Sequence, residues 1–305
     1  RAANGVIMIT TKHGKKGELS LTFDSYVGWQ EIPKNLDLLN LREYAVHKNT
    51  LASLGIVTRD TNFIRPDLLG EGTDWQKELF TTAMMQSYNL SASGGTDKTT
   101  YSMGIGYLDQ DGIAIGSAFK RFNLRGVIDS QVKDYLKMGV NFNLSNAEQK
   151  TTVSDDSLIL TALKQTPNVA VRNADGTYDG PATSEFVQTN PIGLAMLKDN
   201  HNTQVGMRAT TYAEIGFTKD LKFKTTYSID YGFHSDYKFD PSYTFGAIVN
   251  EVRTGQRSKS DSKYWNWNNL LTYNKNFEFT ILMRCLEKKC KNHIGKIYMV
   301  QEQDI

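Results

Sequence analysis

Hydrophobic and polar residues alternate with a period of two in eight separate segments of this 305-residue chain. The clearest segment runs from residue 136 to residue 145, where the odd positions are mostly polar and the even positions are Leu136, Met138, Val140, Phe142 and Leu144. Side chains of a β-strand point alternately to opposite faces, so each segment predicts a strand with one apolar and one polar face. The segments are 19–29, 87–93, 101–107, 119–129, 136–145, 205–217, 221–234 and 264–273.

The connections between these segments alternate between short and long. The short ones are 94–98, 130–134, 218–220 and 274–276, and the others are 30–86, 109–112, 147–202 and 235–260. Transmembrane β-barrels join their strands by short turns on one rim and long loops on the other. The order therefore predicts an all-β fold, an antiparallel meander of about eight transmembrane-type strands of an outer-membrane barrel. That this barrel is larger than eight strands is implied only by the family resemblance given below. The face of Val140 is expected to meet lipid, and Lys137, Asn141 and Asn143 are expected to face the lumen.

One long connection has the signals of a short helix. Asn40 is suited to cap a helix N-terminus, and Glu43 stands three residues later, as in a capping box. Leu41, Tyr44 and further residues follow at helical spacing until Gly55. A single helix is predicted in this loop.

Charge and composition exclude several classes of protein. The formal net charge is +2, from 35 basic and 33 acidic residues, so no global field favours nucleic acid. No apolar run approaches the ~20 residues that a membrane-spanning helix needs. The first residues do not have the pattern of a signal peptide, so the true start is expected to lie upstream. Both cysteines follow residue 284, and a cysteine-free body fits the cell envelope.

The opening residues, RAANGVIMITTK followed by GKKG at 14–17, resemble the end of the plug domain in SusC/RagA-type TonB-dependent transporters. Residues 73–76, 90–95, 106–112 and 122–125 are similar to early barrel segments of that family. The resemblance implies that residues 1–17 end a plug domain and that 18–276 form the N-terminal part of a barrel. The segment that contacts TonB, nearly all of the plug and about two thirds of the strands are not in this sequence.

What the resemblance implies for function is the import of a large nutrient, such as an oligosaccharide or a peptide, across the outer membrane. A SusD-like surface lipoprotein and the TonB complex are the partners it implies, with outer-membrane lipid around the barrel. The chain by itself is expected to be inactive. Two alternatives stay open, namely a small eight-stranded porin or adhesin and a soluble glycan-binding β-protein.

Residues 277–305 depart from this pattern. The alternation gives way to the sequence ILMRCLEKKCK at 281–291, which contains both cysteines. The segment is therefore expected not to pair as a barrel strand. An altered reading frame or a junction artefact stands beside a divergent ending as its explanation.

No residue pattern argues for an enzyme, a cofactor or a metal site. Cys285, Cys290 and His293 supply three ligands where a structural zinc site needs four. Asp109 and Asp111 begin like a calcium loop, but the glutamate that such a loop needs at its twelfth position is Lys120. A turn is the better interpretation.

Aromatic residues in the long loops are the candidates for substrate contact, because their rings can stack on sugar faces or pack against a capping protein. The candidates for substrate binding are Trp75, Tyr178, Phe186 and Tyr243, and Tyr237 and Phe245 lie in the same loops. Packing within the loops is the alternative role for all of them. Trp265 and Trp267, at the start of a strand, are expected in the aromatic girdle at the membrane surface.

Overall fold

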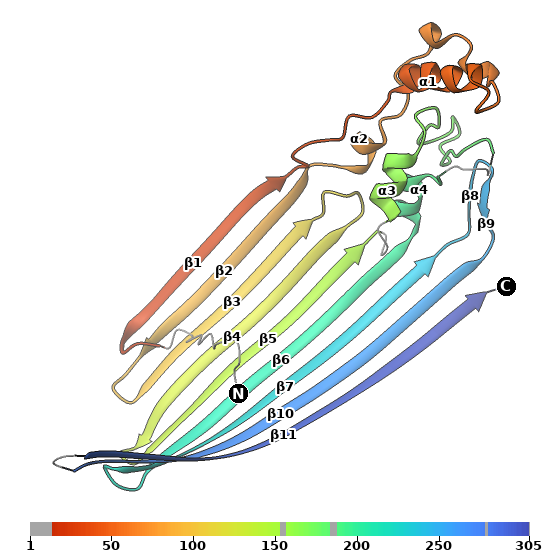
Figure 1. Cartoon of the computed structure of the whole chain (residues 1–305). Helices are drawn as coiled ribbons and strands as arrows, with labels where there is room; N and C mark the ends of the chain where they lie inside the picture. Colours follow the sequence, from red (N-terminus) through yellow and green to blue (C-terminus); the bar gives the residue numbers. More distant parts are fainter. Residues whose placement is uncertain (1–13, 153–156, 184–187, 278–279, 305) are drawn as a thin grey trace.

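A computed structural model describes residues 14–152, 157–183, 188–277 and 280–304. One antiparallel sheet dominates it, with the strands in the order β1-β2-β3-β4-β5-β6-β7-β10-β11 (Figure 1). The strands are β1 (Gly17–Gln30), β2 (Ala83–Gly95), β3 (Thr99–Asp111), β4 (Ala118–Lys133), β5 (Leu136–Thr151), β6 (Asp199–Gly216), β7 (Leu221–Asp240), β10 (Arg253–Phe277) and β11 (Thr280–Asp304). Neighbours in space are thus also neighbours in sequence, which is a meander.

The eight predicted strands are confirmed as β1 to β7 and β10. Most run further than the alternation indicated; β7, for example, continues to Asp240. The short connections after β2, β4 and β6 all lie at the same end of the sheet, as predicted (Figure 1). The fourth predicted turn, 274–276, is wrong, because β10 continues through it to Phe277.

The expectation that residues 277–305 would not pair as a strand is also wrong. Strand β11 is antiparallel to β10 and in register with it, from Phe277 opposite Thr280 to Arg253 opposite Asp304. A sheet ladder is made by backbone N–H and C=O groups, so it does not require alternating side chains. An altered reading frame remains a hypothesis that this pairing does not test.

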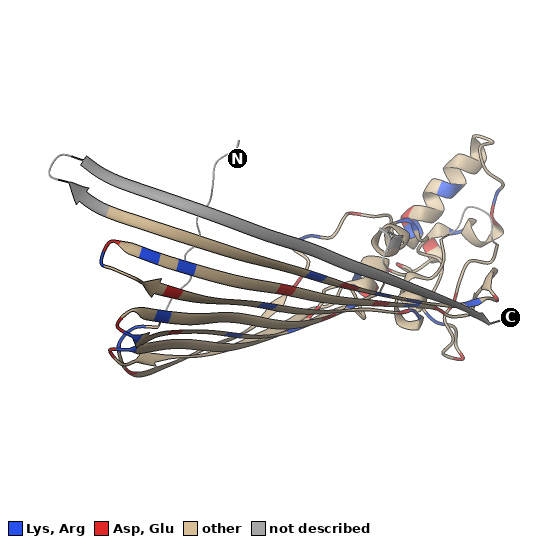
Figure 2. Ribbon diagram, turned by 90° about the horizontal axis from the view of Figure 1, so that it is seen from below, with Lys and Arg blue, Asp and Glu red and all other residues tan. Residues whose placement is uncertain are grey.

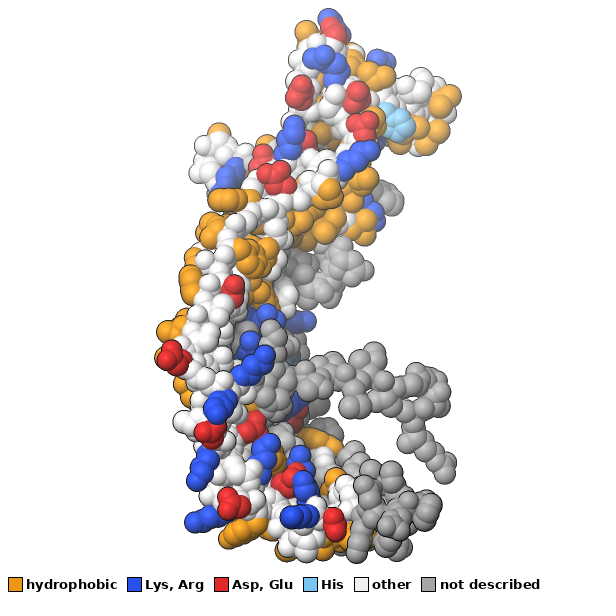
Figure 3. All heavy atoms as spheres, turned by 90° about the vertical axis from the view of Figure 1, so that its left-hand side faces the viewer, with side chains coloured by type: hydrophobic (Ala, Val, Ile, Leu, Met, Phe, Trp, Pro, Cys, Tyr) orange, Lys and Arg blue, Asp and Glu red, His pale blue; other side chains and the backbone are white. Residues whose placement is uncertain are grey.

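The two faces of the sheet differ in polarity, as the alternation predicted. Val140 of β5 lies opposite Ile128 of β4 and Thr211 of β6, on the face that carries most of the exposed large hydrophobic side chains. These include Leu21, Phe23, Trp29, Leu90, Ile105, Phe122, Met138, Leu144, Met207 and Tyr227. Figure 3 shows hydrophobic side chains along one side of the strands, while charged ones gather at the short-turn end and in the loops. An apolar face of this extent suits contact with lipid.

The sheet is curved and open. Seen from below, the strands curve into a trough (Figure 2), and the strand order makes β1 and β11 the two edges of the described sheet. These edge strands are not hydrogen-bonded neighbours in the described sheet. The prediction that the strands form part of a wider cylinder is consistent with this shape, because a small closed barrel would pair its first and last strands.

A cap of helices and loops stands at the other end of the sheet (Figure 1). It contains α1 (Leu41–Ser53), two 3₁₀ turns (Thr61–Phe63 and Pro66–Leu68), α2 (Trp75–Leu79), α3 (Ser157–Lys164), α4 (Pro191–Leu197) and the hairpin of β8 (Tyr243–Phe245) and β9 (Ile248–Asn250). We call this part the loop-side cap. Within the described residues, no helix has the length and apolar character needed to cross a membrane.

The predicted helix is confirmed as α1, with its capping box. The Asn40 side chain accepts a hydrogen bond from the Glu43 backbone N–H at 3.0 Å, and the Glu43 carboxylate accepts one from the Asn40 N–H at 3.0 Å. Helices α2, α3 and α4 were not predicted. The main buried cluster of the described chain lies in the cap between these three helices, and it consists of Trp75, Leu79, Leu158, Ala162, Val169, Ile192 and Ala195.

Candidate functional site

The concave face of the sheet is lined by polar side chains. A hollow of about 390 Å³ lies over β1 to β5, and Asp24, Asn89, Asn123, Arg125 and Asn143 line it. Glycines on β3 make room for these longer groups. A Cβ atom on Gly104 would come within 2.9 Å of the Arg125 Nε atom. Asn143, which the sequence placed toward the lumen, therefore lies on the concave side together with Arg125.

Paired charges continue this polar lining across β4 to β7. The Arg208 guanidinium contacts the Asp230 carboxylate at 2.5 Å, and the Tyr212 hydroxyl donates to Asp129. The Lys224 ammonium lies 4.6 Å from the centre of the Tyr212 ring. These groups hold one another in place, so the lining is polar but locally balanced in charge.

A further polar group stands near the loop end of the concave face. The His234 Nε2 atom lies 2.6 Å from the Asp236 carboxylate, and the Asn202 amide donates to the same carboxylate at 2.7 Å. The three side chains come from β6 and β7. Because the Asp236 carboxylate contacts both neighbours, the three side chains hold one another in place.

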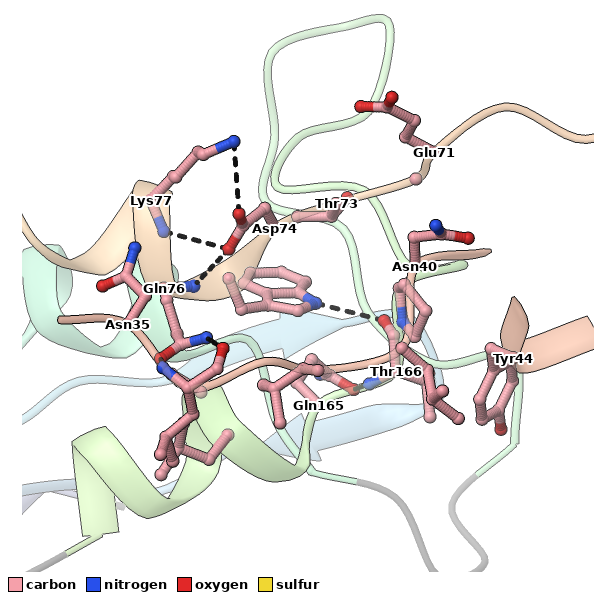
Figure 4. A pocket seen from close by; sticks show the side chains of 18 of the residues that line it. Asn35, Asn40, Tyr44, Glu71, Thr73, Asp74, Gln76, Lys77, Gln165 and Thr166 are labelled. Carbon is pink, nitrogen blue, oxygen red and sulfur yellow. Dashed lines mark hydrogen bonds and ion pairs between the residues drawn. The ribbon is translucent and has the colours of Figure 1, made fainter. Parts of the chain in front are cut away.

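The loop-side cap contains a separate pocket of about 390 Å³ (Figure 4). Three segments form it: residues 35–40 before α1, residues 71–77 around the start of α2, and residues 162–167 at the end of α3. Two of its walls are tied together by Gln76, whose side-chain amide exchanges two hydrogen bonds with the Leu36 backbone at 2.8 and 2.9 Å. The pocket is thus built from parts of two different loops.

The contact between these two loops is close. The Thr73 N–H donates to the Pro167 carbonyl at 2.9 Å, and the Thr73 hydroxyl donates to the Val169 carbonyl at 2.7 Å. Gly72 has a φ of 77°, and a Cβ atom there would lie 2.4 Å from the Pro167 oxygen. Only glycine fits both the backbone angle and this approach.

Polar groups in the pocket wall are largely used within the protein. Asp74 caps α2 by accepting from the backbone N–H groups of Gln76 and Lys77, and it also contacts the Lys77 ammonium at 3.5 Å (Figure 4). Tyr44 lines one side, edge-on to Phe63. Burial, together with the nearby Asp60 carboxylate, raises the pKa of Tyr44, so its hydroxyl stays protonated and can donate a hydrogen bond.

The candidate aromatic residues occupy different environments in the cap. Trp75 is only 3% exposed, and its indole N–H donates to the Thr166 carbonyl at 3.1 Å, although one side of the residue lines the pocket. Tyr178 packs edge-on against Phe245 and lies under the Arg172 guanidinium at 4.1 Å. Tyr243 stacks on Phe245 at 4.5 Å.

The structure therefore brings Tyr178, Tyr243 and Phe245 together and leaves Trp75 at the pocket. Phe186 lies outside the described residues. Tyr237 lies on β7 opposite His201 and Arg257. Contact of any of these rings with a substrate stays a prediction.

The predicted girdle residues lie on the apolar face, but their predicted place at the start of a strand is wrong, because β10 begins at Arg253 and Trp267 lies in the row of Val140. Trp265 stacks with Tyr227 at 6.4 Å, and the Trp267 indole N–H donates to the Thr225 hydroxyl at 2.9 Å. The luminal groups Arg125, Arg208 and Asp230 were not singled out from the sequence. Their signal was available, because each stands at a polar position of an alternating segment.

No metal centre is found in the parts of the chain that the structure describes, where no three His, Cys, Asp or Glu side chains gather to hold an ion. Asp109, weighed above as a calcium ligand, contacts the Lys120 ammonium at 3.2 Å. The side chains of Cys285, Cys290 and His293 lie outside the description.

Comparisons with known proteins agree with this geometry. No protein-family model matches the chain. TonB-dependent receptor P3 of Formosa agariphila is 29% identical over 290 residues, which are 91% of this chain and 27% of that protein. TonB-dependent receptor SusC of Bacteroides thetaiotaomicron is 26% identical over 99% of this chain and 30% of its own length. The chain thus spans about a quarter to a third of the curated relatives.

Solved structures show the same fold. The RagAB peptide transporter superimposes with a TM-score of 0.80 at 20% identity, over 100% of this chain and 38% of the other. The closed-closed state of the RagAB peptide importer gives a TM-score of 0.79 over 99% of this chain.

A meander with an apolar outer face, a polar concave face and large loops at one end defines part of an outer-membrane β-barrel. The chain is similar to the SusC/RagA type of TonB-dependent receptors over about a quarter to a third of their length.

Proposed function

We propose that the chain forms part of the wall and the outer mouth of an importer for a large nutrient, an oligosaccharide or a peptide. The observation that carries this proposal is the polar concave face, which leads from the short-turn rim to a pocketed cap at the other end. Such a surface offers many hydrogen-bonding groups to a polar oligomer. The small porin or adhesin is a weaker alternative, because the described sheet has nine strands and open edges. A soluble glycan-binding protein would not expose the apolar face described above.

The pocket in the cap supports a role in capturing the oligomer. It lies at the end of the sheet where the loops are long, and its wall combines the Trp75 ring with polar backbone and amide groups. A mixed wall of this kind suits one sugar unit or one side chain of a peptide. Two partners follow from the family resemblance, a SusD-like surface lipoprotein over the mouth and the TonB complex as the source of energy.

Uptake by cells tests this function. The gene is deleted in its own host, and uptake of fluorescently labelled oligosaccharide and peptide mixtures is compared with that of cells carrying the restored gene. We expect deletion to lower the uptake of one oligomer class and to leave the uptake of single sugars and amino acids unchanged. Unchanged uptake of both classes would contradict the proposal.

The cap is tested in the same cells with Tyr44→Phe and Arg59→Gln. The first removes a hydroxyl from the pocket wall, and the second removes a charge from the same loop outside the pocket. We expect the first change alone to raise the concentration needed for half-maximal uptake. Purification of the tagged protein from outer membranes tests the surface lipoprotein, which is expected to accompany it.

A further inference from the structure

The outer face of the sheet changes from apolar to polar along a row that crosses six strands. In the register of the sheet, Asp109 of β3 lies beside Lys120 of β4, and the row continues through Glu148, Thr203 and Ser235 to Lys259 of β10. The next row toward the cap contains Asp111, Ala118, Lys150, His201, Tyr237 and Arg257. These rows mark where the apolar band ends on the loop side.

Charge along these two rows is uneven. Over β3 to β5 the carboxylates of Asp109, Asp111 and Glu148 outnumber the ammonium groups of Lys120 and Lys150, and Lys120 is paired with Asp109. Over β10 the same level carries Arg257 and Lys259, with Lys263 on the same face nearer the middle of the sheet. The three cations are exposed, and Asp261 is the acidic residue between them.

Planar side chains lie against one another across three strands at this place. The centre of the His201 ring lies 4.8 Å from the centre of the Tyr237 ring. The Arg257 guanidinium lies 5.3 Å from the centre of the same Tyr237 ring. His201, Tyr237 and Arg257 stand directly opposite one another on β6, β7 and β10. We call these three residues together with Lys259 and Lys263 the basic sector. The Tyr237 ring positions the guanidinium, and among the described side chains Arg257 has no ion-pair partner, so its N–H groups can bind an anion.

The end of the apolar band places the basic sector at the membrane surface. The continuous run of apolar outward residues ends at Val205 on β6 and at Phe233 on β7, and the next outward residues, Thr203 and Ser235, lie in the row of Lys259. Long cationic side chains at such a boundary reach toward lipid phosphates. A basic group just outside the apolar band therefore meets the head groups and not the hydrocarbon.

We propose that the basic sector binds the phosphate groups of anionic lipids in the outer leaflet, and that the rows over β3 to β5 do not. The charge of the two regions differs in sign, while their depth relative to the apolar band is the same. The contact would hold an anionic lipid against the β6–β7–β10 side of the wall. This inference rests on residence in the outer membrane and not on the nutrient that is carried.

Quenching of tryptophan fluorescence by brominated lipids tests it. The protein as its host expresses it is reconstituted in phosphatidylcholine bilayers, and brominated phosphatidic acid or brominated phosphatidylcholine is added. The part of the emission that is lost in Trp267→Phe reports lipid acyl chains against β10, below the basic sector. We expect phosphatidic acid to quench this part at lower concentration than phosphatidylcholine does.

Two charge-removing variants separate the effect of the basic sector from the effect of the protein's overall charge. Each basic residue near an anionic surface contributes on the order of 1 kcal/mol, so Arg257→Gln with Lys259→Gln should weaken the preference about thirtyfold. The matched control, Lys120→Gln with Lys150→Gln, removes equal charge from the same two rows. It should leave the preference for phosphatidic acid over phosphatidylcholine unchanged. If the double variant does not assemble, Lys259→Gln alone should weaken the preference about fivefold.

Three outcomes would overturn the proposal. One is the absence of any preference for phosphatidic acid in the unchanged protein. Another is an equal loss in the basic-sector variant and in the control. The third is complete relief of the Trp267-dependent quenching by inorganic phosphate, which would assign the basic sector to a free anion and not to lipid.

Discussion

Arginine at the middle of the outward face of β5 should destabilise the barrel, whereas arginine at the next residue should not. Val140 lies four residues from Leu136 and four from Leu144, the two ends of the apolar run. At ~3.3 Å per residue and a strand tilt of ~40°, each end is about 10 Å away in depth. Val140 therefore sits near the middle of the apolar band.

The expected cost follows from that depth. A cationic side chain on the lipid face costs about 2–4 kcal/mol at the bilayer midplane and ~0–1 kcal/mol near the interfaces. Val140→Arg should therefore lower the folding equilibrium constant by about 30- to 900-fold. Leu144→Arg, nearer the polar row, should cost less. Asn141→Arg points to the hydrated concave side, where the pocket lining already includes Arg125, so its effect should be small.

Urea unfolding of the protein in lipid vesicles, followed by tryptophan emission and by heat-dependent mobility in gels, measures these costs. The measurement uses the protein as its own host expresses it, because the sheet of this chain has open edges. Equal destabilisation by Val140→Arg and Asn141→Arg would refute the assignment of faces. A larger cost for Leu144→Arg than for Val140→Arg would refute the depth argument.

Three further predictions concern the cap, the edges and one turn. Trp75→Ala removes a buried ring and should destabilise the cap by about 3–5 kcal/mol, which limited proteolysis should detect as faster cleavage near residues 153–183; Trp75→Phe should lose less. Residues 1–305 expressed with an export signal should neither insert as a heat-modifiable barrel nor raise nutrient uptake, because two open edges leave backbone groups that a bilayer cannot satisfy; protease-resistant insertion would contradict this. The Thr177 hydroxyl and N–H donate to Asp175 and lower the pKa of that carboxyl below 3.8, so this turn should be most stable above that pH and should loosen as the pH falls through the lowered pKa; amide hydrogen exchange at Thr177 should show this, and Asp175→Asn should remove the pH dependence.

The sequence predicted those parts of the fold that depend on side-chain pattern. Alternation located eight strands because one face meets lipid and the other meets water. It stopped short of the true start of β10, since both faces of this strand are polar beyond the apolar band. It also stopped short of the end of β7, although the alternation continues there through Tyr237 and Phe239. It missed β11 for a related reason, as this strand is defined here by backbone pairing with β10.

Local signals explain the successes and failures in the cap. The capping box of Asn40 and Glu43 depends on four neighbouring residues, so it was visible in the sequence. Asn190 followed by Pro191 is an equally local helix start and was overlooked, although the Asn190 side chain caps α4 as such a pair predicts. The burial of Trp75 depends on residues 91 positions away. No local pattern distinguishes such a residue from an exposed ring.

The hydrogen bonds from Thr73 to Pro167 and Val169 join two loops of the cap, and this limits how each loop can change over evolution. Each loop supplies hydrogen-bond partners and buried surface to the other. Replacing one loop alone would therefore leave hydrogen-bond donors in the remaining loop without acceptors. Residues 31–82 and 152–198 should therefore change together among relatives, as one unit. Chimaeras between relatives that exchange both together should fold, while those that exchange a single loop should lose the cap.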